Sequence, residues 1–173
     1  MKFEPTYVYG QIDLTKEKNL ILWKFGELIK NLITIASNAH KQRHIIGMGA
    51  VADEMALDFD SYFTLSYNQY LDNQLLDKDA FDELILLDDF FEKRSGDKDP
   101  DFWDDSLLDA NNDWNIVREK AKRILEIMGL DYLDIECNHS NIYDDKGIIG
   151  QQTTTRLVNK KSLIDLTVSK IIV

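Results

Sequence analysis

Residues 112–137 read NDWNIVREKAKRILEIMGLDYLDIEC, and the apolar positions in this stretch change their period at Gly129. Before the glycine, apolar side chains recur every three or four residues, which predicts a helix that begins at Asn112 or Asp113. After the glycine, apolar and acidic residues alternate as far as Cys137, which is typical of a strand. Helix and strand therefore meet in one stretch, and Gly129 separates them.

Upstream of this stretch, the helical period occurs in three further segments. The predicted helices cover about Thr15–Ala39, about Ile46–Tyr62, and a segment that begins at Asp77 or Asp79 and ends at Ser95-Gly96. An aspartate suits a helix start because its carboxylate accepts hydrogen bonds from free N–H groups and favours the positive end of the helix dipole. Glycine is a common residue just after a helix end.

Strands are predicted mainly towards the C-terminus. Residues 144–147, Asp-Asp-Lys-Gly, predict a tight hairpin turn, and a β-branched run through Thr153–Thr155 follows it. The tail Leu163–Val173 is rich in Ile, Leu and Val and predicts another strand. At the other end of the chain, Tyr7–Tyr9 predicts a short strand before the first helix.

Length and composition indicate one domain. With 173 residues, 44% of them hydrophobic, the chain is long enough to bury a sizeable core. We expect a single α+β domain over residues 1–173, dominated by helices over about 13–129, with a small C-terminal antiparallel sheet over about 130–173. The N-terminus lacks an apolar signal core, no apolar run reaches the roughly 18 residues of a membrane span, and Cys137 is the only cysteine, so we expect a cytoplasmic protein.

Negative charge is concentrated in the middle of the chain. Between Asp53 and Asp113 there are 19 acidic and four basic side chains, a net charge of −15, whereas the remainder of the chain carries +4. A field of one sign attracts partners of the opposite sign and repels nucleic acid and anionic membranes. We therefore expect a basic protein partner, no nucleic acid and no membrane; the oligomeric state is left open.

An acidic loop lies inside this region. The spacing of Asp97, Asp99 and Asp101 imitates the start of an EF-hand calcium loop. Phe102 and Leu108, however, occupy the positions where that loop needs a glycine and a bidentate glutamate. A solvated acidic loop is therefore the preferred interpretation.

Two aromatic residues stand within the acidic loop. Phe102 and Trp103 either anchor the loop in the core, or at least one of them is exposed as an apolar anchor ringed by carboxylates, as in a binding hot spot. Burial of an aromatic ring supplies affinity, while the surrounding acids supply speed and discrimination. The predicted partner-binding residues, from the loop and the end of the third helix, are Asp89, Glu92, Asp97, Asp99, Asp101, Phe102, Trp103, Asp104 and Asp105.

Two other patterns involve residues that can bind metals or act as nucleophiles. His40 and His44 are four residues apart, so a helix places both on one face as in half of a zinc site, but the two cations between them oppose a metal ion. Cys137 and His139 face the same side of a strand, as a nucleophile and its base would, yet a small buried cysteine is the preferred interpretation. We expect no catalytic residue, metal or cofactor.

The aromatic and acidic positions in the middle half of the chain form a further pattern. They comprise DEMALDFD at 53–60, LDDFFEKRSG at 87–96, DFWD at 101–104, and Asp113-Trp114 with Arg118. This pattern resembles small acidic bacterial immunity proteins paired with polymorphic or contact-dependent growth-inhibition toxins. The resemblance implies a noncatalytic protein that binds and blocks a cognate toxin domain, often a nuclease, inside the producing cell.

Charge pattern and resemblance favour the same function, a noncatalytic acidic protein that neutralises a cognate toxin domain by covering its basic surface. Two alternatives stay open. One is a metal-assisted enzyme that uses clustered carboxylates. The other is an adaptor or structural subunit with a merely solvated acidic face, in which the apolar helix Thr15–Ala39 or the Ile-rich tail forms an oligomer contact.

Overall fold

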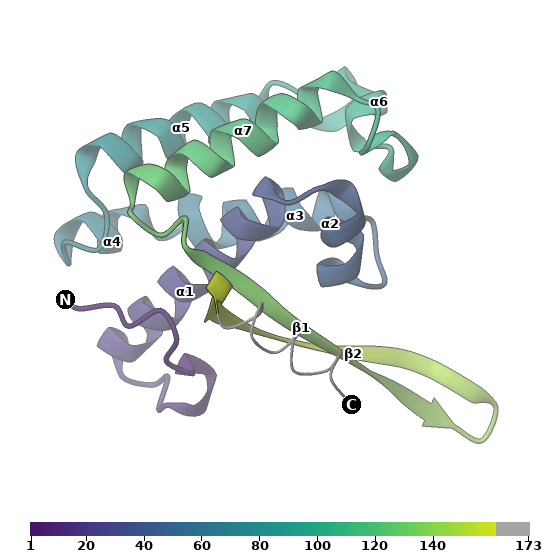
Figure 1. Ribbon diagram of the computed structural model, residues 1–173, viewed down its shortest axis with the longest axis horizontal. Helices are drawn as coiled ribbons and strands as arrows, with labels where there is room; N and C mark the ends of the chain where they lie inside the picture. The colour runs from purple at the N-terminus through teal and green to yellow at the C-terminus, as the bar shows by residue number, and fades with distance from the viewer. Residues whose placement is uncertain (162–173) are drawn as a thin grey trace.

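The computed structural model describes residues 1–161, except for the side chain of Asp97, so the strand predicted over 163–173 lies outside the described residues. Helices dominate the structure, and two strands follow them at the C-terminal end (Figure 1). The elements marked η are 3₁₀ turns, except η2, which is a π-helix. In chain order the elements are η1 (Tyr9–Gln11), α1 (Glu17–Ala36), α2 (Ala39–Ile46), α3 (Val51–Phe59), η2 (Asp60–Thr64), α4 (Tyr67–Asp72), α5 (Lys78–Glu92), η3 (Gly96–Lys98), α6 (Pro100–Trp103), η4 (Asp105–Leu107), α7 (Asn112–Ile127), β1 (Leu133–Asp144) and β2 (Gly147–Asn159).

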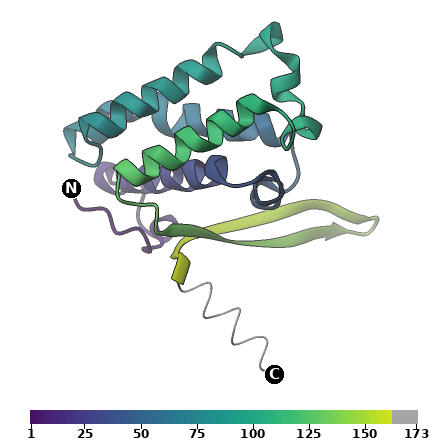
Figure 2. The ribbon, with the colours of Figure 1, turned by 45° about the horizontal axis from the view of Figure 1, so that its top comes forward.

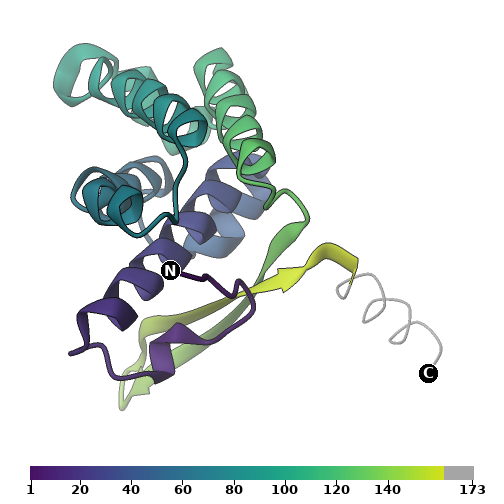
Figure 3. The same ribbon diagram turned by 90° about the vertical axis from the view of Figure 1, so that its left-hand side faces the viewer.

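Helix α1 is the central element of the core. It packs against α7, α3 and β1, while α5 lies beside α7 on the outer side (Figure 1, Figure 3). Its apolar residues are spaced so that side chains on several faces are buried, including Phe25, Leu28 and Leu32. Within residues 1–161, none of the helices is both long and apolar enough to cross a membrane.

The two strands form a long antiparallel hairpin. Asp144 pairs with Gly147, so Asp145 and Lys146 make the two-residue turn that the sequence predicts. The base of the hairpin is buried against the helices, whereas its far half extends away from them (Figure 2). Large apolar side chains are exposed near its tip: Ile142, Tyr143, Ile148 and Ile149. The helix-dominated α+β fold with a small antiparallel sheet is confirmed.

Several observed elements differ from the predicted ones. The first predicted helix ends at Ala36, because Ser37 and Asn38 are extended. The Asn38 side chain accepts a hydrogen bond from the backbone N–H of Lys41 and starts α2, which lies between the first two predicted helices and is absent from the prediction. Gly47, at φ +77°, ends α2 before α3 begins. The short helix α4 is absent from the prediction, and the strand predicted at Tyr7–Tyr9 is wrong, since a 3₁₀ turn begins there.

Arg118 is a charged residue of α7 that the fold buries, although a charged side chain is rarely buried without a partner. Its side chain is only 8% exposed. The guanidinium donates to the backbone carbonyls of Ser37 and Leu108 and to the side-chain oxygen of Gln42. A buried cation is tolerated where such acceptors replace its hydration. Arg118 thus joins α7 to the start of α2 and to the end of the acidic loop.

Candidate functional site

A groove of about 1000 Å³ lies on the acidic side of the molecule, and we call it the acidic groove. Elements α3, η2, α5 and α6 supply its walls. Five of its 14 lining residues are acidic and none of the 14 is basic. The lining residues are Asp53, Ala56, Leu57, Phe59, Asp60, Thr64, Asp88, Phe91, Glu92, Ser95, Gly96, Pro100, Trp103 and Asp104.

Aromatic rings form the floor of the acidic groove. Phe59 and Phe91 come from the buried faces of α3 and α5, and their ring centroids lie 5.7 Å apart. Trp103 is half-buried, with its ring centroid 6.4 Å from that of Phe91. Its indole N–H donates to the Arg94 carbonyl at 2.6 Å, which fixes the ring orientation. Leu57, 61% exposed, adds an apolar side chain at the edge.

Carboxylates surround this floor. Asp53 and Asp60 belong to the α3 side, Asp88 and Glu92 to α5, and Asp104 follows α6. Among the side chains that the structure describes, none of these five carboxylates makes an ion pair. Apolar surface surrounded by unpaired charges of one sign is suited to a ligand that carries an apolar group and charges of the other sign.

Asp88 shows that the negative charges of the groove are crowded. Burial raises the pKa of Asp88 above its usual range, and the neighbouring carboxylates of Asp60, Glu92 and Asp89 raise it further. A hydrogen bond of 3.2 Å from the Thr64 hydroxyl opposes this rise. A cation placed in the groove would relieve the repulsion, so the electrostatics favour a positively charged ligand.

Phe102 and Trp103, adjacent in sequence, have different positions. Phe102 is fully buried, and its ring is stacked on Trp114 with centroids 4.7 Å apart. The Trp114 indole N–H also donates to the Phe102 carbonyl at 2.7 Å. Phe102 therefore belongs to the core and is not available to a partner, whereas Trp103 lines the groove.

Three of the predicted acidic residues accept hydrogen bonds from the protein's own backbone. Asp104 accepts one from the N–H of Ser106 at 2.8 Å and starts η4. Asp105 accepts hydrogen bonds from the N–H groups of Val51 and Ala52, both at 2.8 Å, and so satisfies the start of α3. Asp99 precedes α6 and accepts a hydrogen bond from the N–H of Phe102 at 3.3 Å. All three carboxylates are engaged within the fold, and Asp104 also lines the groove.

The other predicted acidic residues are distributed around the groove. Glu92 and Asp104 line it, Asp101 is exposed on α6, and Asp89 is half-buried on α5 beside Asp88. The side chain of Asp97 lies outside what the structure describes.

The sequence prediction missed the α3 side of the groove. Asp53, Leu57 and Asp60 follow one another at steps of four and three residues, so they share one helix face. That spacing is the only local signal in the sequence for this wall of the groove. The opposite wall of the groove comes from α5, about 30 residues further along the chain. Local spacing within one helix does not reveal that the two helices lie side by side.

The histidine and cysteine patterns meet at a second place, where the end of α2 contacts the hairpin. The Cys137 sulfur lies 3.4 Å from His139 Nε2, so the two residues do face the same side of β1. Burial raises the pKa of the Cys137 thiol, which is the opposite of what an activated nucleophile requires. The histidine that joins them is His44, and not His40.

Comparisons with known proteins add no relative. No model of a known protein family, no curated protein and no solved structure matches this chain. What the acidic groove binds is therefore inferred from its own chemistry.

Proposed function

We propose that this chain is a noncatalytic binding protein that inhibits a basic protein partner by holding a cationic segment of it in the acidic groove. The observation that carries this proposal is the pairing of an aromatic floor with five carboxylates that have no ion-pair partner among the described side chains. Acidic residues placed only for solubility would not need to converge on buried aromatic rings.

The two parts of the groove act on different aspects of binding. An apolar side chain of the partner, seated on Phe91 and Trp103, is removed from water and supplies affinity. Lysine and arginine residues beside it meet the carboxylates at the rim, which raises the association rate from an ordinary 10⁵–10⁶ M⁻¹s⁻¹ towards about 10⁸ M⁻¹s⁻¹ at low salt.

The partner we propose is a toxin domain with a cationic cleft, such as a nuclease, neutralised in the cytoplasm of the cell that makes it. A nuclease cleft attracts phosphate groups, and carboxylates presented by an inhibitor compete for the same cations. The resemblance to immunity proteins supports this choice of partner, as does the charge of −15 between Asp53 and Asp113. Fast association matters for an inhibitor of a lethal enzyme.

The test compares two triple variants with the same change in charge. The groove variant is Asp53→Asn, Asp60→Asn and Glu92→Gln, and the control variant is Asp72→Asn, Glu126→Gln and Asp131→Asn, whose side chains are exposed outside the groove. Wild type, groove variant and control are each used to capture proteins from the source cell at low and high salt. The captured domain is then assayed for its own activity with and without each variant.

We expect wild type and control to capture one basic domain at near-equal stoichiometry, with salt-sensitive binding, and to inhibit its activity. The groove variant should bind it at least about tenfold more slowly, because the carboxylates that attract it are lost. If the groove variant captured the same domain as well as the control variant does, the partner would contact a surface other than the acidic groove. Capture of a basic domain without inhibition would retain the binding role and remove the inhibitor role.

One observation favours a second candidate, an adaptor or structural subunit. The apolar face of α1 is used in the core and is not available for an oligomer contact, but the hairpin tip exposes Ile142, Tyr143, Ile148 and Ile149. Exposed apolar side chains gathered at one place indicate an interaction surface. Light scattering compares wild type with the double variant Ile148→Ser, Ile149→Ser. This candidate requires that wild type forms an oligomer and that the double variant does not.

A further inference from the structure

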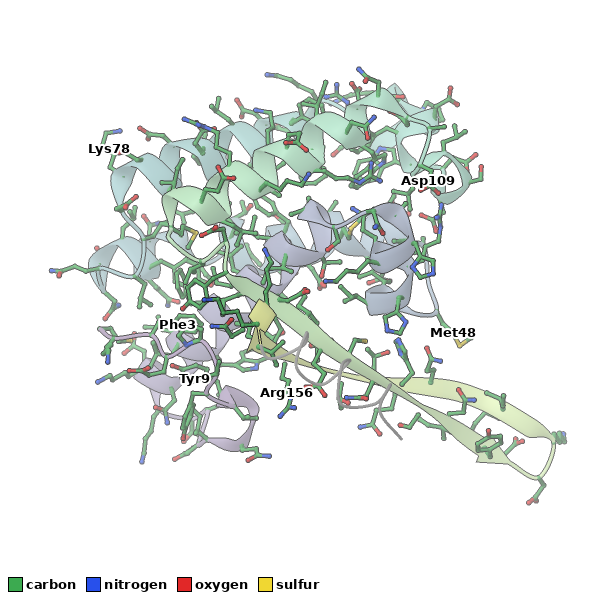
Figure 4. All side chains as sticks on the ribbon, in the orientation of Figure 1. Phe3, Tyr9, Met48, Lys78, Asp109 and Arg156 are labelled. Carbon is green, nitrogen blue, oxygen red and sulfur yellow. The ribbon has the colours of Figure 1, made fainter. Side chains whose placement is uncertain are left out.

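Three residues with metal-binding side chains converge where the last turn of α2 meets the hairpin. His44 comes from α2, and Cys137 and His139 come from β1, 93 and 95 residues later. One nitrogen of each imidazole and the Cys137 sulfur all lie within 4.8 Å of one another. The two imidazole rings meet edge to face, with centroids 5.1 Å apart. Met48, labelled in Figure 4, marks the loop that lies beside the hairpin at this place.

The cations that follow His40 in sequence do not oppose a metal ion here. Lys41 forms an ion pair with Asp134, and Arg43 forms one with Asp109 at 2.8 Å. Arg43 also donates to the carbonyl of Asp105. Both positive charges are thus neutralised by ion pairs with aspartates. From the sequence alone, the same two charges argue against a metal site at this helix.

Both ring nitrogens of His139 have a partner close by. Its Nδ1 lies 2.9 Å from the Thr153 hydroxyl oxygen, and its Nε2 lies 2.6 Å from the carbonyl oxygen of His44. Two tautomers fit these contacts: Nε2–H can donate to the His44 carbonyl, or Nδ1–H can donate to Thr153, which leaves the Nε2 lone pair available to a metal ion once its contact with the carbonyl opens. The carbonyl end of α2 adds the negative pole of its helix dipole.

The close approach of the two elements depends on Gly47. A Cβ at this position would lie 2.7 Å from Oε1 of Gln151 and 3.3 Å from Cε1 of His139, and the residue has φ +77°. Glycine therefore lets α2 end directly against the hairpin, which is what brings His44 to the two residues of β1.

We propose that His44, Cys137 and His139 bind a divalent cation of intermediate softness, Zn²⁺, at the junction of α2 and the hairpin. One thiolate and two imidazoles are ligands that Zn²⁺ prefers, and a tetrahedral ion held by three protein ligands keeps one position for water. Thr153 holds the outer nitrogen of His139, as residues beside metal ligands commonly do. On binding, the thiol proton of Cys137 leaves to solvent and His139 carries its proton on Nδ1.

The test uses the full chain and two histidines of the same helix. His40 and His44 are both exposed, so His40→Ala and His44→Ala remove the same group from the same element with little effect on the core. Cys137→Ser replaces the thiol, and circular dichroism checks that each variant is folded. Zn²⁺ binding is measured by competition with a chromophoric chelator, and Co²⁺ is used as a spectroscopic probe of thiolate ligation.

Wild type and His40→Ala are expected to bind one Zn²⁺ per chain and to show the near-ultraviolet absorption of a Co²⁺–thiolate bond. His44→Ala should bind at least about tenfold more weakly, and Cys137→Ser should also lose that absorption. Zn²⁺ should raise the unfolding midpoint of wild type and His40→Ala more than that of His44→Ala. Equal affinities in all four proteins, without thiolate absorption, would mean diffuse binding to surface carboxylates and would overturn the proposal.

Discussion

The α3 and α5 walls of the acidic groove and the loop Asp99–Asp105 contain the same type of side chain in opposite roles. In the loop, the carboxylates of Asp99 and Asp105 accept hydrogen bonds from the protein's own N–H groups. At the groove, Asp53, Asp60 and Glu92 are exposed and make no ion pair among the described side chains. A high density of acidic residues therefore does not by itself mark a binding surface.

The two roles differ in whether the carboxylate has a hydrogen-bond donor within the protein. A carboxylate with backbone donors stabilises the fold, and its loss is measured as a loss of folding free energy. A carboxylate without a partner contributes repulsion, and its loss is measured in the binding of a cation. Stability measurements on single variants can thus sort the acidic residues without knowledge of the partner.

We expect the largest loss of folding stability on replacement of Arg118, which donates to the carbonyl of Leu108 after the acidic loop. Arg118→Ala removes the donors to the carbonyls of Ser37 and Leu108 and to the Gln42 side chain. We expect a loss of about 3 kcal/mol in the free energy of unfolding, because buried acceptors are left without donors. Lys122→Ala on the exposed side of α7 is the control, with a change below about 0.5 kcal/mol. Equal losses in urea unfolding would show that Arg118 is not a structural anchor.

The next largest effect is a difference in folding stability between variants of Asp105 and Asp101. Asp105→Ala leaves the N–H groups of Val51 and Ala52 without their acceptor, so unfolding in urea should show a loss of about 1–2 kcal/mol. Asp101→Ala removes an exposed carboxylate and should change stability by less than about 0.5 kcal/mol. If the two variants were equally stable, the proposed division between structural and unpaired acids would fail within the loop.

The smallest effect has the opposite sign and concerns Asp58, on another face of α3. Burial, followed by the charges of Glu54 and Glu27, raises the pKa of Asp58 to about 6. The folded state therefore favours the protonated form, and stability falls as the pH rises from about 4 to about 6.

Asp58→Asn should remove this fall, because the amide carries no charge at any pH. The free energy of unfolding should be about 1 kcal/mol above wild type at pH 7, a value reduced by partial exposure to solvent, with little difference at pH 4. Urea unfolding at both pH values measures this. A variant that is less stable than wild type at pH 7 would show that the carboxylate has a favourable partner.

The sequence predicts features whose determinants lie within a few residues. Asp77 accepts a hydrogen bond from the N–H of Ala80 at 2.8 Å and starts α5, as its type and position indicate. Gly129, at φ +64°, ends the last helix, and the turn at Asp145-Lys146 closes the hairpin. Such caps and turns depend on local backbone geometry, so short-range patterns are sufficient.

Short-range sequence patterns do not predict contacts between segments that are far apart in the chain. The hydrogen bonds from Asp105 to the start of α3 span more than 50 residues, and His44 meets Cys137 across 93 residues. Within α6, the sequence also left open which of Phe102 and Trp103 faces outward. That choice depends on the space beside Trp114 in the assembled core, which only tertiary packing defines.

The π-helix Asp60–Thr64 makes the acidic groove sensitive to the number of residues in this segment. A π-helix bonds residue i to residue i+5, so its turn holds about one residue more than an α-helical turn. Deletion of one residue here would restore an α-helical turn and rotate the preceding helix by about 100° relative to the following one. We therefore expect a one-residue deletion within Ser61–Phe63 to change how the α3 wall faces the α5 wall, although every lining residue of the groove would still be present.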